Sequence, residues 1–143
     1  MSCIYGPRQF GTEDQGWIAH FTLNTLENEP LTIYGDGKQV QDILYMTDLV
    51  RAYHSFLTDP TGRPAVYNIG GGPEQTTSLL ELLTGNRTDV TFEDWREGDQ
   101  KVYITDIGRA RSALNWEPTI DLKEGFQRYL DWYAATDTEF PHE

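Results

Sequence analysis

The sequence has a single cysteine, Cys3, among its 143 residues. One cysteine excludes an intramolecular disulfide and a cysteine-based zinc cluster, and it favours a reducing compartment. The cytoplasm is therefore the expected location. The sequence also lacks a run of about 20 apolar residues and an N-terminal basic region followed by an apolar core. We therefore expect neither a membrane partner nor a targeting signal.

Basic residues are also scarce. Eleven Lys and Arg stand against 23 Asp and Glu, which gives a formal net charge of -12. This charge disfavours binding to a nucleic-acid backbone or to an anionic membrane. The hydrophobic content of 38% and the aromatic content of 13% are too high for a disordered acidic tail. The length and composition therefore predict one globular domain spanning residues 1–143.

The apolar pattern predicts an α/β fold in which short strands and helices are mixed. Helix boundaries come from capping signals: Thr47 with Asp48, Ser78 with Glu81, and Asp121 with Glu124. Strands are expected at residues 1–5, 31–34, 40–45, 65–69, 90–92 and 102–104, and helices at 16–27, 48–58, 78–84, 106–114 and 121–135. The first strand has no turn or helix before it, so the chain is expected to begin within a sheet.

Two motifs resemble parts of a dinucleotide enzyme without matching their mechanism. Gly35 and Gly37 supply two glycines of a dinucleotide fingerprint, but Val40 replaces the third glycine and a strand follows instead of a helix. Tyr34 and Lys38 have the spacing of a Tyr-x-x-x-Lys pair, which requires a helix that the intervening glycines disfavour. Both patterns are therefore interpreted as features of a turn.

Other candidate sites are also explained better by structure than by chemistry. The glycines at 70–72 are followed by Pro73, which lacks the backbone donor that a phosphate cradle would need, so a tight turn is favoured. Cys3 has no evident base beside it. The three histidines are scattered at His20, His54 and His142. We therefore expect neither a catalytic residue nor a metal site in this chain.

Polar residues gather in three loops, at 8–15, 38–42 and 95–100. The most distinctive member is Arg96, which follows Trp95 in a glycine-containing loop and could bind an anion with two donors. A surface salt bridge from Arg96 to Glu93 or Glu97 is an equally good interpretation of the residues alone.

Four segments carry a family resemblance: Tyr5–Trp17, Ile33–Val40, Arg96–Val102 and Asn115–Pro118. Together they resemble the extended short-chain dehydrogenase/reductases, a family of NAD-dependent nucleotide-sugar epimerases and dehydratases. The resemblance covers residues 2–134 in order and is greatest to the CDP-paratose 2-epimerases (CDP-tyvelose epimerases) of that family.

This resemblance implies a partial fold. The chain would be the small C-terminal, substrate-binding part, without the N-terminal Rossmann half that supplies the NAD loop and the catalytic Tyr-x-x-x-Lys pair. No cofactor is therefore expected on this chain alone, and Tyr5 and Pro7 would lie near the nicotinamide only if a Rossmann partner were supplied. The residues that the resemblance places at the substrate are Arg96, Gln41, Gln15, Thr32, Ile33, Tyr34 and Asp99.

One departure from the family pattern concerns the diphosphate. Arg96 would hold it, but Gln41 stands where the family usually has a second arginine. Losing a charge-assisted bond would cost about 1.5–3 kcal/mol of diphosphate affinity.

Three functions follow from these expectations. The first is a free-standing protein that resembles an epimerase substrate domain, binds a CDP- or UDP-sugar weakly, and is not competent for NAD-dependent epimerisation alone. The second is a subunit that completes an epimerase in trans with a separate Rossmann chain. The third is a homo-oligomeric structural or interaction protein, which exposed apolar surface at Cys3–Tyr5 and around Pro7 would favour.

Overall fold

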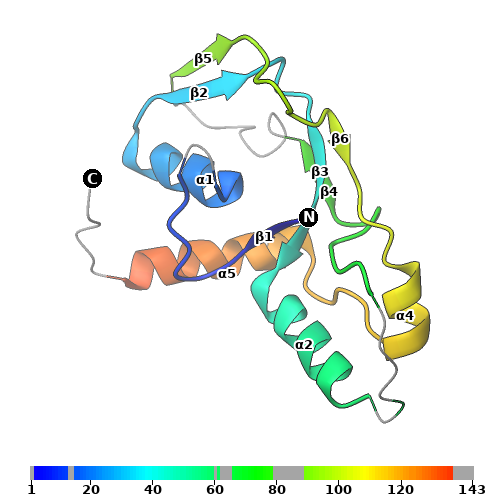
Figure 1. Cartoon of the computed structure of the whole chain (residues 1–143). Coiled ribbons are helices and arrows are strands. Elements are labelled where there is room, and N and C mark those ends of the chain that lie inside the picture. The colour runs from blue at the N-terminus through cyan, green and yellow to red at the C-terminus, as the bar shows by residue number, and fades with distance from the viewer. Residues whose placement is uncertain (1, 13–14, 60, 62–65, 79–88, 137–143) are drawn as a thin grey trace.

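The computed structural model describes residues 2–12, 15–59, 61, 66–78 and 89–136, and these residues form a mixed α/β structure (Figure 1). The α/β prediction is confirmed. The elements, in chain order, are β1 (Cys3–Tyr5), α1 (Trp17–Glu27), β2 (Leu31–Tyr34), β3 (Val40–Tyr45), α2 (Met46–Leu57), β4 (Thr76–Ser78), β5 (Val90–Glu93), β6 (Val102–Tyr103), α4 (Gly108–Leu114) and α5 (Leu122–Ala135).

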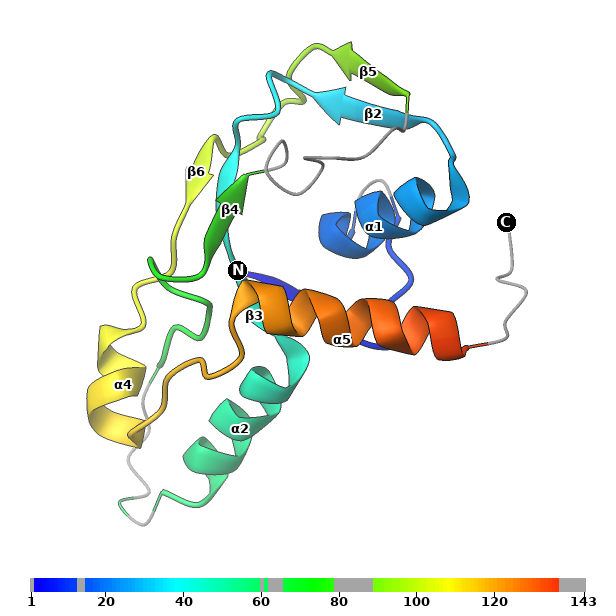
Figure 2. The same ribbon diagram turned by 180° about the vertical axis from the view of Figure 1, so that it is seen from behind.

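β3 is the central strand because its two halves pair with different partners. Its last three residues, Ile43–Tyr45, run parallel to β1. Its first three, Val40–Asp42, pair with β4 in the antiparallel direction, and Val40 and Gln41 also pair with β6 in parallel. β2 pairs instead with β5 and forms a separate two-stranded parallel sheet. β3 therefore joins the two ends of the molecule, with β2 and β5 at one end and α2 and α4 at the other (Figures 1 and 2).

The alternation of side chains along β1 divides the core into layers. Cys3 and Tyr5 face one side, where they pack with Ile18 of α1, while Ile4 packs on the other side with residues of α2 and α4. α1 lies between β2 and α5 in both views (Figures 1 and 2). Its apolar residues contact both neighbours, since Phe21 packs with β2 and Ala19 packs with α5.

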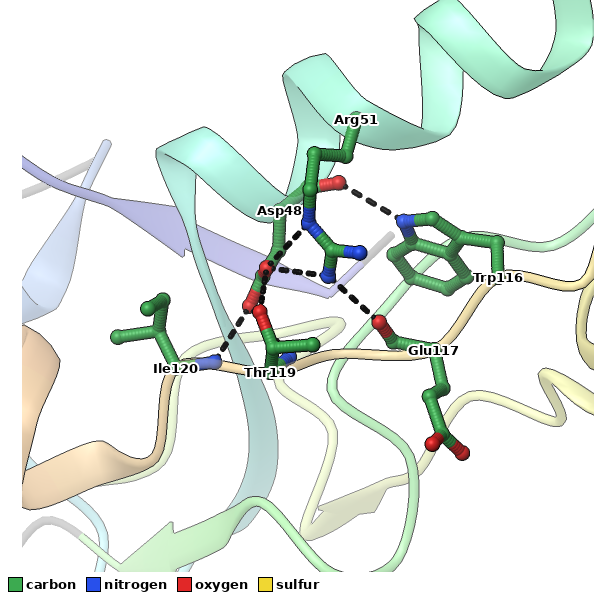
Figure 3. Close-up of polar contacts among 6 residues, drawn as sticks. All are labelled: Asp48, Arg51, Trp116, Glu117, Thr119 and Ile120. Carbon is green, nitrogen blue, oxygen red and sulfur yellow. Dashed lines mark hydrogen bonds and ion pairs between the residues drawn. The ribbon is translucent and has the colours of Figure 1, made fainter.

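The carboxylate of Asp48 organises one corner of this core (Figure 3). Asp48 is 0% exposed and accepts hydrogen bonds from the backbone N–H groups of Thr119 and Ile120, both at 3.0 Å. Arg51 donates to the same carboxylate at 2.6 Å and to the carbonyl of Glu117 at 2.7 Å. The indole of Trp116 donates to the Asp48 carbonyl at 3.0 Å. These contacts fasten residues 116–120 to the start of α2.

This network corrects the expected start of α2. Thr47 and Asp48 were predicted to cap a helix over 48–58, but α2 begins at Met46 and its N-cap residue, Tyr45, makes no side-chain capping bond. The Asp48 side chain accepts from the backbone of Thr119 and Ile120 and from the Arg51 side chain, and it does not cap the start of its own helix. A short-range capping pattern could not reveal a partner about 70 residues away.

The strand predicted at 65–69 is wrong for residues 66–69, which are not part of a strand, and Ala65 lies outside the described residues. Tyr67 and Ile69 pack on the core cluster of Leu44 and Trp116. The apolar residues of this segment therefore reflect core packing and not a strand. The antiparallel partner of β3 is β4, which was not predicted. Ser78 ends β4, and the remainder of the helix expected at 78–84 lies outside the described residues.

The two C-terminal helices follow the predictions more closely. α4 begins at Gly108, two residues after the expected start. Asp106 precedes the helix, and its side chain accepts from the N–H of Gly108, the first helical residue. α5 begins as expected, with the Asp121 side chain accepting from the N–H of Glu124 at 2.8 Å. Local capping therefore located α5 correctly.

Candidate functional site

Arg96 lies on Tyr34. The guanidinium carbon is 3.5 Å from the centroid of the Tyr34 ring, which is the close stacking geometry of a cation–π contact. Tyr34 ends β2, and Arg96 lies in the loop that follows β5. Since β2 and β5 are paired in parallel, their ends meet at one edge of the sheet and bring these residues together. Two residues that the family resemblance places at the substrate are therefore in contact.

The neighbouring residues, Gly35 and Trp95, are also in close contact. Gly35 has φ of +85°, and a Cβ added there would lie 2.5 Å from the indole of Trp95. Only glycine satisfies both the left-handed backbone and the approach of this ring. The ammonium nitrogen of Lys101 lies 5.2 Å from the centroid of the Trp95 ring. A protein with net charge -12 thus gathers Arg96 and Lys101 on two aromatic side chains.

Gln41 is held by α1. The indole Nε1 of Trp17 donates to the amide oxygen of Gln41 at 3.2 Å. This contact occupies one lone pair of the Gln41 amide oxygen, and the two amide N–H groups are the donors that the side chain can offer an anionic ligand. An arginine at this position could not accept the indole hydrogen bond, because a guanidinium has only donors.

The other residues expected at the substrate occupy different environments. Ile33 is 1% exposed and packs against α1, so only its backbone could reach a ligand, whereas Thr32 is half-buried. Gln15 is exposed and exchanges two backbone hydrogen bonds with Thr12. Asp99 is exposed and its N–H donates to the carbonyl of Arg96 at 3.2 Å. The structure therefore joins Tyr34 with Arg96 and Gln41 with Trp17 as two separate pairs.

The residues expected near a nicotinamide lie in and after β1. Tyr5 is 2% exposed, and its ring contacts that of Tyr45 edge to face at 5.5 Å. Pro7 is half-buried in the turn after β1. Burial raises the pKa of the neighbouring Cys3 thiol to about 11, so this thiol is protonated at neutral pH and is a poor nucleophile.

The glycine run at 70–72 packs inward. The N–H of Gly72 donates to the buried carboxylate of Asp42 at 2.9 Å, and the N–H of Gly71 donates to the Ser2 hydroxyl at 3.4 Å. A Cβ at Gly70 would lie 2.6 Å from the Asp42 carboxylate. These glycines serve close packing, and a turn follows from Gly72 to Gln75. The sequence favoured a turn from a strand to a helix, whereas this turn leads into β4.

A separate cavity of about 400 Å³ lies between α2, β1 and β6. Its wall contains none of the residues that the sequence placed at the substrate. The lining residues are Ile4, Leu49, Tyr53, Tyr67, Asn68, Ile69, Tyr103 and Thr105.

In the part of the chain that the structure describes, no cluster of three or more His, Cys, Asp or Glu side chains is placed to hold a metal ion. None of the described helices combines the length and apolar character needed to cross a bilayer.

Sequence reasoning identified Arg96 from its local context but missed the contributions of Trp17 and Lys101. Trp17 was seen only as the start of a helix, and its contact with Gln41 spans two elements. Lys101 follows the polar loop directly and was an accessible signal, since an aromatic residue and two cations occur within residues 95–101.

Comparison with known proteins identifies relatives of the whole arrangement. Residues 1–70 match the model of the NAD dependent epimerase/dehydratase family. The chain is 38% identical to CDP-paratose 2-epimerase of Salmonella typhi, over 94% of this chain and 43% of that protein. The chain therefore spans less than half the length of this relative.

Solved structures of nucleotide-sugar epimerases also match this chain. The UDP-glucose 4-epimerase of Thermotoga maritima, solved with UDP-glucose, matches with a TM-score of 0.81 and 33% identity, over 92% of this chain and 43% of that one. The UDP-glucuronic acid 4-epimerase of Bacillus cereus, solved with UDP-glucuronic acid and NAD, matches with a TM-score of 0.78 and 29% identity, over 92% and 43%. Together, these matches show that the chain belongs to the NAD dependent epimerase/dehydratase family.

Proposed function

We propose that this chain is the substrate-binding part of a nucleotide-sugar epimerase and that it binds the diphosphate of a CDP- or UDP-sugar weakly through Arg96. The contact of Arg96 with Tyr34, at 3.5 Å, is the observation that carries the proposal. A guanidinium presents its N–H groups in one plane and matches two phosphate oxygens at once. The relatives solved with UDP-glucose and with UDP-glucuronic acid support this ligand class.

Weak affinity follows from the second position in the site. Gln41 is neutral and its acceptor is used by Trp17. A diphosphate would therefore meet one guanidinium and one neutral amide, while the net charge of -12 repels it at long range.

The described residues do not fit the pyrophosphate of NAD. The turn at Gly35–Gly37 leads into β3, and the N–H groups of Gly71 and Gly72 are bonded to Ser2 and Asp42. Neither glycine segment presents a helix N-terminus to a phosphate. We therefore propose no hydride or proton-transfer step on this chain alone.

A second candidate is a role in trans, with a separate Rossmann chain supplying NAD and the catalytic residues. One observation favours it: among the described strands, β1 pairs only with β3, so β1 lies at the edge of its sheet. Such an edge can accept another strand. Copurification of a Rossmann chain with this protein would support the role, and a mass spectrum of the purified material showing this chain alone would contradict it.

Calorimetry with UDP-glucose and with a CDP-sugar tests the proposed binding. Arg96→Ala should weaken binding about 10- to 100-fold, the loss of a charge-assisted contact of about 1.5–3 kcal/mol. Arg109→Ala is the matched control, since Arg109 lies 5.4 Å from the ring of Tyr67 in another part of the molecule. Binding by the wild type that Arg96→Ala leaves unchanged would contradict the site.

Gln41→Arg supplies the opposite change. It should strengthen binding and increase its dependence on salt, because it adds a second positive charge. The gain in affinity should be partial, because the indole N–H of Trp17 loses its acceptor. Replacing that indole by Trp17→Phe in the Gln41→Arg background should therefore increase the affinity further. Equal affinity and salt dependence in the wild type and Gln41→Arg would place Gln41 away from the diphosphate.

A further inference from the structure

Two consecutive residues of one loop cover two consecutive residues at the end of β2. Trp95 lies on Gly35, where any Cβ would approach the indole to 2.5 Å, and Arg96 lies on Tyr34. Because Trp95 fits closely against a residue without a side chain, it fixes the backbone from which Arg96 extends.

The stack determines what Arg96 can bind. A guanidinium carbon only 3.5 Å from the ring centroid leaves no room for an N–H group between the two, which favours a guanidinium parallel to the ring with its five N–H donors in its own plane. Two oxygens of one phosphate can then be met edge on. A lysine at this position would carry a single ammonium and could neither stack in this way nor bind with two parallel donors.

The same contact restricts Tyr34. The ring face under Arg96 is covered at 3.5 Å, so a nucleobase cannot stack on that face while Arg96 remains in place. On this side, the Tyr34 ring therefore contacts Arg96 and not a nucleobase.

We propose that Tyr34 is a positioning residue for Arg96, whose stacked guanidinium binds phosphate oxygens in its plane. This inference rests on the proposed function, since it concerns the same anion site. It adds that affinity depends on an aromatic ring at position 34 and that the hydroxyl of that ring is dispensable for binding.

The test compares Tyr34→Phe with Tyr34→Leu, using inorganic pyrophosphate and UDP-glucose as probes in calorimetry. Tyr34→Phe keeps the ring and should bind both probes within about twofold of the wild type. Tyr34→Leu removes the ring and should weaken both about three- to tenfold. In the Arg96→Ala background the Leu substitution should cause no further loss. Tyr67→Leu, which removes a looser arginine contact elsewhere, is the matched control and should leave binding unchanged.

A second measurement uses the wild type and does not depend on the folding of a variant. The side-chain Nε–H resonance of Arg96, assigned by its loss in Arg96→Ala, should be shifted upfield by the Tyr34 ring in the free protein, and it should move when pyrophosphate is added. An unshifted resonance in the free protein would overturn the inference.

The outcomes separate the two claims. If the wild type binds the probes and Tyr34→Leu binds them as well as Tyr34→Phe, the inference is overturned while the proposed function stands. A loss with Tyr34→Leu that is equally large in the Arg96→Ala background also overturns it, because Tyr34 would then act independently of Arg96. If the wild type binds neither probe, the proposed function fails and the inference fails with it.

Discussion

Asp48 is a buried charge whose partners come from two distant parts of the chain. Its carboxylate accepts from Arg51 within α2 and from Thr119 and Ile120 in the segment before α5. Burial raises the pKa of this carboxyl, but the hydrogen bonds from Ile120, Arg51 and Thr119 outweigh burial and leave the pKa below its ordinary value of 3.8. The charged form is therefore the one that the folded protein stabilises.

Asp48→Asn should lower the free energy of unfolding at pH 7 by about 2–3 kcal/mol. An amide replaces one acceptor oxygen by a donor, so at least one of the N–H groups of Thr119 and Ile120 loses its partner. Urea denaturation at pH 7 measures this loss. Asp131→Asn, on the exposed face of α5, is the control and should change stability by less than about 0.5 kcal/mol.

The pH dependence of the same variant gives an independent check. Because the folded pKa of Asp48 lies below 3.8, the stabilisation by its charge is fully present above the unfolded pKa and is lost as pH falls through the folded value. The difference in stability between the wild type and Asp48→Asn should therefore narrow below about pH 4. A difference that stays constant down to pH 2 would show that the Asp48 charge contributes nothing.

At the scale of elements, α5 approaches the sheet closely at Gly125. A Cβ there would lie 2.9 Å from the ring of Tyr45 and even closer to the hydroxyl of Tyr5. Gly125 is in the first turns of α5, where the Tyr5 hydroxyl also donates to the carbonyl of Leu122 at 3.4 Å. The contact between α5 and the β1–β3 pair therefore requires a residue without a side chain.

Gly125→Ala should destabilise the protein by about 1–3 kcal/mol through overpacking, although alanine favours a helix by about 1 kcal/mol over glycine. Tyr5→Phe removes the hydroxyl that the new methyl group would meet, so Tyr5→Phe should recover part of the loss in the Gly125→Ala background. Denaturation of the two single variants and the double variant measures this coupling. Additive effects would show that the methyl group and the hydroxyl do not meet.

The elements that the sequence predicted well are those with local signals. The α5 start depends on Asp121 and Glu124, which are three residues apart, and the β2 strand is bounded by Pro30 and Gly35. β4 was missed because its residues, Thr76–Ser78, resemble a helix cap until β3 is placed beside them. The run at 66–69 shows the converse, since apolar residues that pack need not form a strand.

In the candidate site, too, local sequence identified some residues and tertiary packing determines their contacts. Arg96 was identified because Trp95 and the glycine-containing loop are its sequence neighbours. Its contact with Tyr34 depends on the pairing of β2 with β5, and the contact of Trp17 with Gln41 depends on how α1 packs. Sequence patterns therefore indicated which residue types could bind an anion, while the geometry that positions them is tertiary.

At the scale of the whole molecule, exposed apolar side chains form a stripe along α2. Met46, Val50, Tyr53 and Leu57 follow a spacing of four, three and four residues, which places them on one helix face. Their exposure runs from 47% at Met46 to 80% at Leu57. In β1, by contrast, Tyr5 is buried and Cys3 is half-buried. The surface expected to favour self-association is therefore on α2 rather than at Cys3–Tyr5.

We expect the protein to self-associate through this stripe, because apolar side chains in a row on one face lose contact with water when a second copy covers them. The net charge of -12 opposes association at low ionic strength, so added salt should increase the dimer fraction. Light scattering over a range of protein and salt concentrations should show a mass that rises with both. Leu57→Asp should shift the equilibrium to the monomer, whereas Leu26→Asp, an equivalent change at an exposed residue of α1, should not. A monomer at every concentration, or equal effects of the two substitutions, would show that α2 does not mediate self-association.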